Sequence, residues 1–346
     1  MTFIKIRNFL TKLRAWEYWP MSLFYAPVYA YWFYLGLKAR SIFFFTAANP
    51  GIKNGGMVAA SKKQILDMIP NQYIPATVLL SAPVYYNDVE LAMQKSGLAF
   101  PVIFKPDVGE RGWKVEKINN KKEVEAYLAA FNADLQLQEY LDLPFEAGVF
   151  YYRFPEEQKG TVSSIVVKEL LHVIGDGKST LQQLIIKKER ARLQFDALKI
   201  RWQHRFDWIP AKEKRVELQP IGNHNRGTAF LDCNYLITQQ LINSFDKISK
   251  QIDGFYYGRY DVRCQDEEAL KRGEIMIMEL NGAASEPAHI YQSGFSIFKA
   301  YRVLFHHWKI LYQISVVNHA KGTPYTSFKK GYKDLTTSGR VMEQGI

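Results

Sequence analysis

Cysteine is nearly missing from this sequence: its 346 residues include only Cys233 and Cys264. Two cysteines build no disulfide framework, and their spacing fits no zinc-binding pair, so we expect a reducing, cytoplasmic environment in which both are packing residues. An RNA-binding signature and a long basic tract are also missing, so nucleic acid is not an expected partner. The sequence has no internal repeats and no low-complexity segment, which excludes a repeat architecture.

The composition is that of a globular protein, with 47% hydrophobic and 23% charged residues. A chain of this length buries one large core or about two or three smaller ones. The net charge of +11 indicates an anionic partner, such as nucleotide phosphates or an acidic membrane surface. An even spread of the charge over solvated faces is the alternative.

The first 40 residues form a basic and aromatic extension. Residues 1–15 have the pattern of a short basic amphipathic helix, and residues 16–37 read WEYWPMSLFYAPVYAYWFYLGL. Prolines and tyrosines interrupt this run, a composition typical of the bilayer interface, and no signal-peptide cleavage site follows it. The extension predicts peripheral membrane contact through residues 1–38, on the inner face of the cytoplasmic membrane. A helical cap on the protein's own core, a homodimer surface and a true span are the alternatives.

Turn signals and hydrophobic periodicity predict an α+β fold with mostly antiparallel sheets after this extension. Helices are expected at residues 61–70, 86–98 (capped by Asn87 or Asp88), 121–131, 179–195, 235–252 and 297–320. Strands are expected at residues 42–46, 73–81, 99–106, 113–118, 134–141, 145–154, 160–174, 254–264 and 274–280. An acidic insertion at residues 265–274 is expected to be a hairpin loop.

The first candidate site is a glycine-containing loop in residues 100–115, FPVIFKPDVGERGWKV. An apolar strand delivers Lys105, and a loop with Gly109 and Gly112 returns to a second strand. Glycines let backbone amides close on phosphate oxygens, and a lysine supplies a point charge. The loop lacks the Gly-Lys-Ser/Thr of the Walker pattern. It predicts phosphate binding, with a plain β-hairpin turn as the alternative.

The second candidate site is the stretch LQEYLDLPFEAGV, residues 137–149. Glu139 and Glu146 flank a connection that contains Leu141. The backbone of a strand leaving a sheet offers free groups to a purine edge, and a nearby carboxylate accepts hydrogen bonds from ribose hydroxyls. Two surface carboxylates are the alternative.

The third candidate site joins GFYYGRYDVRC with EIMIMELNG, residues 254–264 and 274–282. Arg259 and Asp261 share one strand face, and Glu279 and Asn281 share a face of the next strand. If these strands pair, Asp261, Glu279 and Asn281 present oxygen ligands of the kind that Mg²⁺ prefers. A structural ion pair between Arg259 and Asp261 and a polar strand end are the alternatives.

Taken in chain order, these motifs resemble an ATP-grasp ligase. The set consists of Lys62, Lys105 with its glycine loop, Glu139 and Glu146, Lys168, Arg259-x-Asp261 and Glu279-x-Asn281. It is most similar to the D-alanine–D-alanine ligase and cyanophycin-synthetase branches, over about residues 58–290. VIGDGKSTLQQLI and GNHNRGTAFLD resemble the cyanophycin-synthetase and bifunctional glutathione-synthetase variants.

The resemblance implies two α+β subdomains that grip ATP between antiparallel sheets. The expected divisions are the helical extension at 1–40, a short α/β segment at 41–98, a small subdomain with the glycine loop at 99–165, a large subdomain with the metal site at 166–320 and a tail at 321–346. The residues implied to hold ATP are Lys62, Lys105, Gly109, Glu110, Arg111, Gly112, Glu139, Tyr140, Leu141, Glu146 and Lys168. Within this set, Lys168 approaches the γ-phosphate, Glu139 and the backbone through Leu141 read adenine, and Glu146 binds ribose.

By the same resemblance, Asp261, Glu279 and Asn281 ligate two Mg²⁺ ions, with Mn²⁺ as an alternative, and Arg259 faces a tetrahedral intermediate. The implied activity is an ATP-dependent ligase that joins a small-molecule carboxylate to an amine through an acylphosphate. A kinase of the same fold, acting on a small or lipid-linked substrate, and a membrane-docked nucleotide-binding module are the alternatives.

The sequence departs from the D-alanine ligases after Asn281, where GAASEPAHIY replaces their Ser-Pro-Gly turn. D-alanine is therefore not the expected acceptor. Glu286 and His289 follow closely after the strand that carries Glu279 and Asn281. Contact with substrate and simple packing are the two alternatives for these residues.

Overall fold

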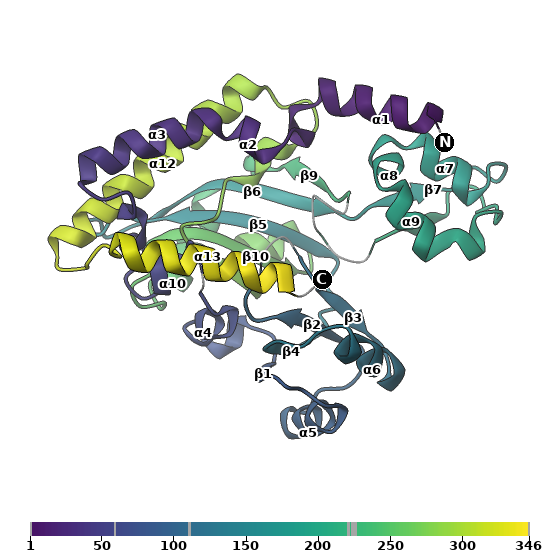
Figure 1. The fold of residues 1–346 in the computed structure, drawn as a ribbon, viewed down its shortest axis with the longest axis horizontal. Helices are drawn as coiled ribbons and strands as arrows, with labels where there is room; N and C mark the ends of the chain where they lie inside the picture. The colour runs from purple at the N-terminus through teal and green to yellow at the C-terminus, as the bar shows by residue number, and fades with distance from the viewer. Residues whose placement is uncertain (1, 59, 110–111, 220–221, 223–226, 345–346) are drawn as a thin grey trace.

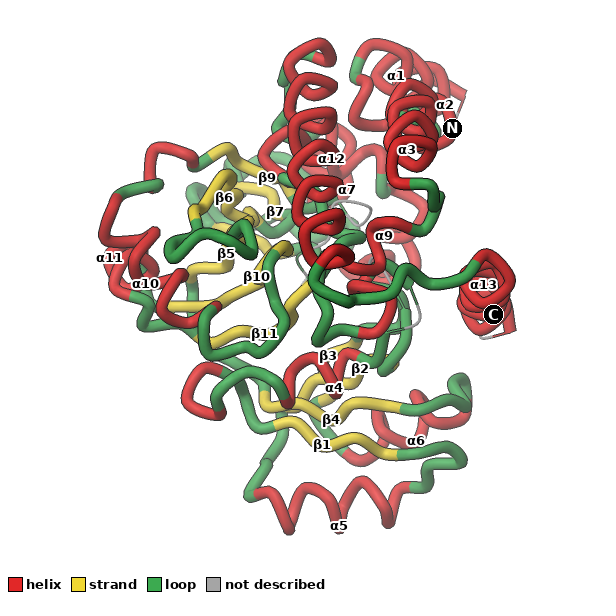
Figure 2. Tube along the Cα trace, turned by 90° about the vertical axis from the view of Figure 1, so that its left-hand side faces the viewer, coloured by secondary structure: helices red, strands yellow, loops and turns green. Residues whose placement is uncertain are grey.

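The computed structural model describes residues 2–58, 60–109, 112–219, 222 and 227–344. A smaller antiparallel sheet lies below a larger one, and a layer of helices runs along the top of the molecule (Figure 1). The described chain thus forms a smaller lower unit and a larger upper unit. The turned view separates the two sheets clearly (Figure 2).

The smaller unit is a sheet with the strand order β1-β4-β2-β3, covered by two helices. Its elements are β1 (Thr77–Leu80), α5 (Tyr86–Ser96), β2 (Val102–Pro106), β3 (Glu116–Ile118), α6 (Lys121–Ala129) and β4 (Leu135–Glu139). Val89 of α5 and Tyr127 of α6 are buried in one cluster with Phe104 of β2. The smaller unit therefore has its own hydrophobic core.

The larger unit is a sheet with the strand order β11-β10-β5-β6-β9, and each of its pairings is antiparallel. Its elements are α4 (Lys62–Asp67), β5 (Phe145–Tyr152), β6 (Thr161–Glu169), β9 (Ala229–Asp232), α10 (Gln239–Ser249), β10 (Tyr257–Cys264), α11 (Glu267–Arg272) and β11 (Met276–Asn281). Helices α4 and α10 bury Leu66 and Phe245 in one cluster with Tyr260 of β10.

The remaining elements surround the larger sheet. A side unit contains β7 (His172–Ile174), α7 (Leu181–Lys187), α8 (Glu189–Leu193), α9 (Phe195–Trp202) and β8 (Arg215–Glu217). The helical layer contains α1 (Thr2–Arg14), α2 (Met21–Phe24), α3 (Ala26–Ala39) and α12 (Ile297–Ala320). Helix α13 (Phe328–Gln344) lies below this layer, in front of the larger sheet in the view of Figure 1. Short 3₁₀ helices lie at Trp16–Tyr18, Phe44–Ala47, Lys53–Gly56, Asn71–Tyr73, Gln203–Arg205, Asn234–Leu236 and Ala288–Tyr291.

The predicted α+β class with antiparallel sheets is confirmed, and so is the pairing of the two strands with the polar residues, β10 and β11. The predicted strand at residues 42–46 is wrong. This apolar run forms the 3₁₀ helix Phe44–Ala47, whose residues are all buried. Phe44 packs edge-on against Trp308 and Tyr312 of α12. A short apolar run does not by itself distinguish a buried strand from a buried helical turn.

Two predicted helix boundaries differ in the structure. The single helix expected at residues 179–195 is broken at Lys188, whose extended backbone separates α7 from α8 and turns α8 toward α1. Tyr85, not Asn87 or Asp88, is the N-cap of α5, because the Asp88 carboxylate accepts a hydrogen bond from the Tyr85 amide.

Two further segments that were expected to be irregular contain helices. The insertion at residues 265–274 forms α11, where Asp266 caps the first turn and Gly273, at φ 74°, ends the helix. Both ends thus carry the expected capping residues. The expected tail at residues 321–346 contains α13.

The smaller sheet does not follow the division expected at residues 98 and 165. Strand β1 lies before residue 98, yet it pairs with β4 through Val78 and Leu137. Strand β5 lies before residue 165, yet it pairs with β10 of the larger sheet. Antiparallel pairing between strands distant in the chain therefore assigns residues 77–139 to the smaller unit.

The aromatic extension covers part of the protein's own core. Trp16 and Phe24 stack at 4.6 Å and are buried in one cluster with Ile290 and Leu304. The alternative of a helical cap therefore holds for this part of the extension. Among the residues that the structure describes, no helix combines the length and apolarity needed to cross a membrane.

Candidate active site

A cavity of about 590 Å³ lies between the two sheets. Its walls come from β2, β4 and the glycine loop of the smaller unit, and from α4, β10 and β11 of the larger unit. Residues of the N-terminal extension, including Trp16 and Phe24, form a further wall. The cavity therefore brings together residues that lie far apart in the chain, from Trp16 to Tyr291.

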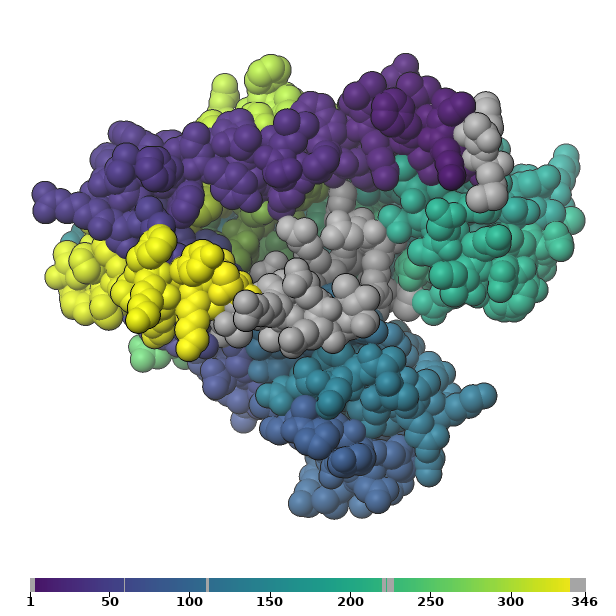
Figure 3. Space-filling view, viewed as in Figure 1, coloured from purple at the N-terminus to yellow at the C-terminus, as the bar shows by residue number. Residues whose placement is uncertain are grey.

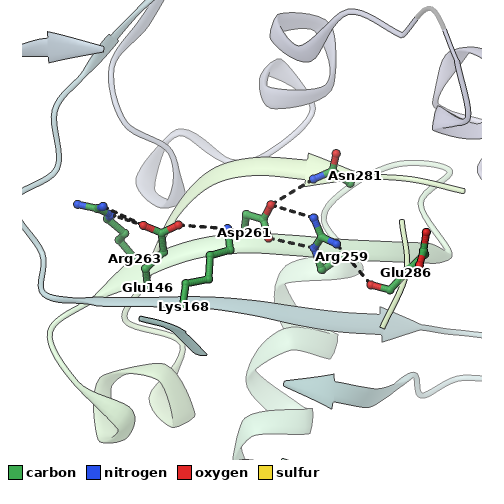
Figure 4. Close-up of polar contacts among 7 residues, drawn as sticks. All are labelled: Glu146, Lys168, Arg259, Asp261, Arg263, Asn281 and Glu286. Atoms are coloured by element: carbon green, nitrogen blue, oxygen red, sulfur yellow. Dashed lines mark hydrogen bonds and ion pairs between the residues drawn. The ribbon is translucent and has the colours of Figure 1, made fainter. Parts of the chain in front are cut away.

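Strands β10 and β11 carry the predicted metal-binding residues into this cavity. Asp261 lies directly opposite Glu279, and Arg259 lies opposite Asn281. The Asn281 amide donates to Asp261 Oδ2 at 3.4 Å, and all four residues line the cavity. Figure 4 shows Arg259, Asp261 and Asn281 turned toward one another. The structure thus gathers the predicted set on one face of the paired strands.

The ion pair that the alternative interpretation predicted is also present. Arg259 Nε and Nη2 lie 3.0 and 3.2 Å from the two oxygens of Asp261. Burial raises the pKa of Asp261, but the charges of Arg259 and Lys168 outweigh it, so the pKa of this carboxyl is lowered overall. Asp261 is therefore ionised at neutral pH and has two cations beside it.

Glu146 links a second pair of cations (Figure 4). Its Oε1 lies 3.1 Å from Lys168 Nζ, and its Oε2 lies 2.8 Å from Arg263 Nη2. Lys168 Nζ is also 3.6 Å from Asp261. Burial lowers the pKa of Lys168, but Asp261 and Glu146 outweigh it and raise this pKa overall. Lys168 is thus a charged ammonium held between two buried carboxylates.

Two lysines join the units across the cavity. Lys105 of β2 donates at 3.1 Å to Gln138 of β4 and at 3.1 Å to the carbonyl of Met278 on β11. Lys62 of α4 lies 3.2 Å from Glu279 and also donates to the carbonyl of Gly109. Burial lowers the pKa of Lys105 to about 8, partly opposed by the charge of Glu279.

The glycine loop joins β2 to β3 as a hairpin, so the alternative interpretation describes its backbone correctly. Gly109 and Gly112 both line the cavity, and both have positive φ values, 152° and 68°. Such angles favour glycine over other residues. Glu110 and Arg111, also predicted to bind the nucleotide, lie outside the described residues.

The predicted adenine-binding stretch forms the edge of the cavity. Glu139 is exposed, and its carboxylate accepts a hydrogen bond from the Ala76 amide at 3.2 Å. The Leu141 carbonyl accepts a hydrogen bond from Arg263 at 2.8 Å. Tyr140 also lines the cavity, and its ring lies under Lys117 at 3.6 Å. Glu139, Tyr140 and Leu141 therefore all line the cavity, and Glu139 is also exposed to solvent.

Several lining residues were missed by the sequence analysis. Arg263 was detectable, because it follows Asp261 at the spacing that puts both on one strand face. Gly222 was not detectable, because its role depends on a contact between segments that are distant in the chain. It lies so close to Glu146 that a Cβ at this position would be 2.5 Å from Oε1. The wall formed by Trp16 and Phe24 has no local sequence signal either.

The chemistry of the donor set fits a hard divalent ion, since two carboxylates and one amide oxygen face a common space. Within the described part of the chain, no three His, Cys, Asp or Glu side chains come together as a metal site does. Asp261, Glu279 and Asn281 supply only two such residues, so ligation of two ions also requires oxygens from elsewhere, such as phosphates.

Glu286 and His289 follow the strand that carries Glu279 and Asn281, and the structure gives them different surroundings. His289 is buried, and its Nδ1 lies 2.7 Å from the hydroxyl of Ser164, so it is a packing residue. Glu286 lines the cavity, and its carbonyl accepts a hydrogen bond from Arg259 at 3.4 Å. Its carboxylate accepts a hydrogen bond from Tyr291 at 2.7 Å.

No protein-family model matches the chain, and no curated protein matches it by sequence. Among solved structures it is similar to VanG D-Ala:D-Ser ligase from Enterococcus faecalis, with a TM-score of 0.41 and 15% identity over 75% of this chain and 62% of the ligase. It is also similar to D-alanine–D-alanine ligase from Bacillus anthracis in complex with ATP. The TM-score is 0.42 and the identity is 14%, over 76% of this chain and 68% of that ligase. A bifunctional glutathione synthetase from Pasteurella multocida has a TM-score of 0.38 and 16% identity, over 74% of this chain and 38% of the synthetase.

The matched region spans less than two thirds of VanG and of the glutathione synthetase. These are enzymes of the kinds that the sequence motifs resemble. Identities of 14 to 16% with TM-scores below 0.5 assign no function to this chain.

Proposed function

We propose that the protein is an ATP- and magnesium-dependent ligase that joins a carboxylate to an amine through an acylphosphate and releases ADP and phosphate. One observation carries the proposal. Asp261, Glu279 and Asn281 gather on two paired strands, and Lys62 and Lys105 reach the same cavity from two other elements. Oxygen ligands beside several cations are what a metal-bound triphosphate requires.

The cations define where the triphosphate would lie. Lys105 belongs to the smaller unit, whereas Lys168 belongs to the larger, so phosphates between them would contact both. Glu146 and the stretch at Leu141 line the same cavity and would hold the nucleoside end. A volume of about 590 Å³ is in the ordinary range for ligand cavities.

Asp261, Glu279 and Asn281 would hold Mg²⁺, which when bound neutralises the charge that develops on the phosphoryl group. The chain's own residues would position the reactants. A substrate carboxylate oxygen bonds to the γ-phosphorus while the bond to ADP breaks. The amine nitrogen then bonds to the acyl carbon, the acyl–phosphate bond breaks, and the extra ammonium proton leaves to solvent.

Arg259 would stabilise the oxyanion formed when the amine attacks, because its charge persists at every working pH. Burial lowers the pKa of Arg259, but Asp261 outweighs it and raises this pKa overall. Arg259 would thus act by fixed charge and not by proton transfer.

The carboxylate and amine substrates would occupy the end of the cavity formed by the N-terminal extension. Trp16, Phe24 and Tyr291 line this end, and Glu286 offers a carboxylate beside them. Such a wall favours a substrate with an apolar or aromatic part, and a carboxylate favours an ammonium group.

The test is a screen for phosphate and ADP release with ATP and Mg²⁺, in which amino acids, dipeptides and acyl amino acids are supplied in pairs. A ligase releases phosphate only when both a carboxylate and an amine are present. A kinase forms ADP and a phosphorylated product without free phosphate, and a binding module forms no ADP. Either of these results contradicts the ligase.

Glu279→Ala should lower turnover by about a hundredfold or more, because it removes a carboxylate from the metal-binding set. Glu274→Ala is the matched control, since this glutamate precedes the same strand but is exposed and pairs with Arg272 at the surface. Equal turnover in Glu279→Ala and the unmodified protein would refute the assignment of Glu279.

A further inference from the structure

Helix α1 has its polar side against the protein and its apolar side toward solvent. The Asn8 side chain exchanges hydrogen bonds with Arg192 of α8, donating to its carbonyl at 3.3 Å and accepting from its Nε at 3.0 Å. Arg192 also donates to the Thr11 hydroxyl at 3.1 Å, and Thr11 donates to Glu189 at 3.3 Å. Polar contacts therefore hold this helix in place, the reverse of an ordinary surface helix.

The outward side of α1 is an apolar stripe. Ile6, Phe9, Leu10 and Leu13 are 54%, 66%, 43% and 60% exposed. At about 3.6 residues per turn these four side chains fall within roughly 100° of the helix circumference. The stripe is thus continuous along the helix, and no described part of the chain covers it.

Basic residues border this stripe on both sides. On a helical wheel Lys5 and Lys12 fall along one edge, and Arg7 and Arg14 fall along the other. Residues 2–40 include only one acid, Glu17, which is buried and pairs with Arg190 at 2.9 Å. An apolar stripe between two basic edges is the arrangement of helices that lie in the headgroup region of an anionic bilayer.

Helix α3 extends the exposed apolar surface. Tyr29, Phe33 and Leu37 are each at least half exposed and recur every four residues, on one side of the helix. The other side packs on α12. Helices α1, α2 and α3 follow one edge of the molecule, and the space-filling view shows them as a band along that edge (Figure 3).

We propose that α1 and α3 dock the protein on the surface of an anionic lipid bilayer, with the apolar stripes among the headgroups and the basic side chains against lipid phosphates. A second copy of the chain is a poorer occupant, because α1 against α1 would bring like charges together with no acid to pair them. This docking stands independently of the ligase activity.

The test is co-sedimentation of the full chain with neutral phosphatidylcholine vesicles and with vesicles that also contain anionic phosphatidylglycerol. We expect partition to the anionic vesicles to exceed that to neutral ones and to fall as salt is added. Phe9→Asp with Leu13→Asp should lower it about tenfold or more, and so should Lys5→Gln with Lys12→Gln. Equal partition to both vesicle types, or to neither, would overturn the proposal.

Leu91→Asp is the matched control, because Leu91 is also exposed but lies on α5, at the opposite end of the molecule from α1 (Figure 1). We expect it to bind vesicles like the unmodified protein. Circular dichroism and the melting temperature report whether each variant is folded. If Phe9→Asp with Leu13→Asp binds vesicles normally but converts a dimer to a monomer in sedimentation velocity, the stripe is a copy–copy interface and lipid docking is wrong.

Discussion

Lys105 is a cavity residue whose charge depends on pH. Its ammonium is buried between two units and has a pKa of about 8, so above that pH the protein without nucleotide holds a neutral amine. A bound phosphate favours the charged form and raises the pKa again. Nucleotide binding should therefore require a proton at alkaline pH but not at neutral pH.

We expect ATP binding at pH 9 to take up close to one proton, and binding at pH 7 to take up almost none. Calorimetry in two buffers of different ionisation enthalpy measures this number. Lys105→Met should remove the uptake at pH 9. If that variant takes up the same number of protons, another group titrates and the phosphate role of Lys105 fails.

Asn49 shows how a short loop element is fixed to the sheet that carries the site. Its amide donates to the carbonyls of Gly55 and Tyr257, and its oxygen accepts from the amides of Tyr256 and Tyr257, all at 2.9 Å. The side chain is completely buried. These bonds attach the segment before α4 to the start of β10.

Asn49→Ala should lower the free energy of unfolding by about 3 kcal/mol, because buried backbone groups lose their partners. Asn318→Ala is the comparison, since the Asn318 amide is also buried and, among the described residues, donates to the carbonyls of Ala47 and Ala48. About half the loss is expected there. Urea unfolding of both variants measures the difference, and equal losses would show that the β10 attachment adds nothing.

The sequence reveals elements whose signal is local. Strands β10 and β11 were predictable because polar residues at alternate positions interrupt apolar runs, and their pairing brings Asp261 and Glu279 together. The segment around Phe44 was not, because burial against α12 decides its conformation. The packing of Trp16 in one cluster with Ile290, which lies in the 3₁₀ helix Ala288–Tyr291, depends on the complete fold, so no pattern near either residue predicts it.

At the scale of the whole molecule, the cavity is shared by two units that have separate cores. A nucleotide that contacts Lys105 in one unit and Lys168 in the other should stabilise the protein as a single body. At a concentration about 100 times Kd, binding adds about 2.7 kcal/mol to the free energy of unfolding.

We expect Mg²⁺ and ATP to raise the melting temperature of the unmodified protein and of Lys95→Met, whose lysine is exposed on α5. Lys105→Met and Lys168→Met should each lose most of the shift, because each removes a phosphate contact from one unit. Comparing every variant with and without nucleotide removes its own effect on stability. An unchanged shift in Lys168→Met would place the nucleotide in the smaller unit alone.

The ion pairs of the cavity have a consequence for the order in which ligands arrive. Asp261 already has Arg259 and Lys168 as counterions, and Glu279 has Lys62. A divalent ion that enters by itself must displace Arg259 from Asp261 and Lys62 from Glu279 and leave both without an anion, whereas Lys168 keeps Glu146. One that enters on a triphosphate brings the anions that receive them, so metal and nucleotide should arrive as a single complex.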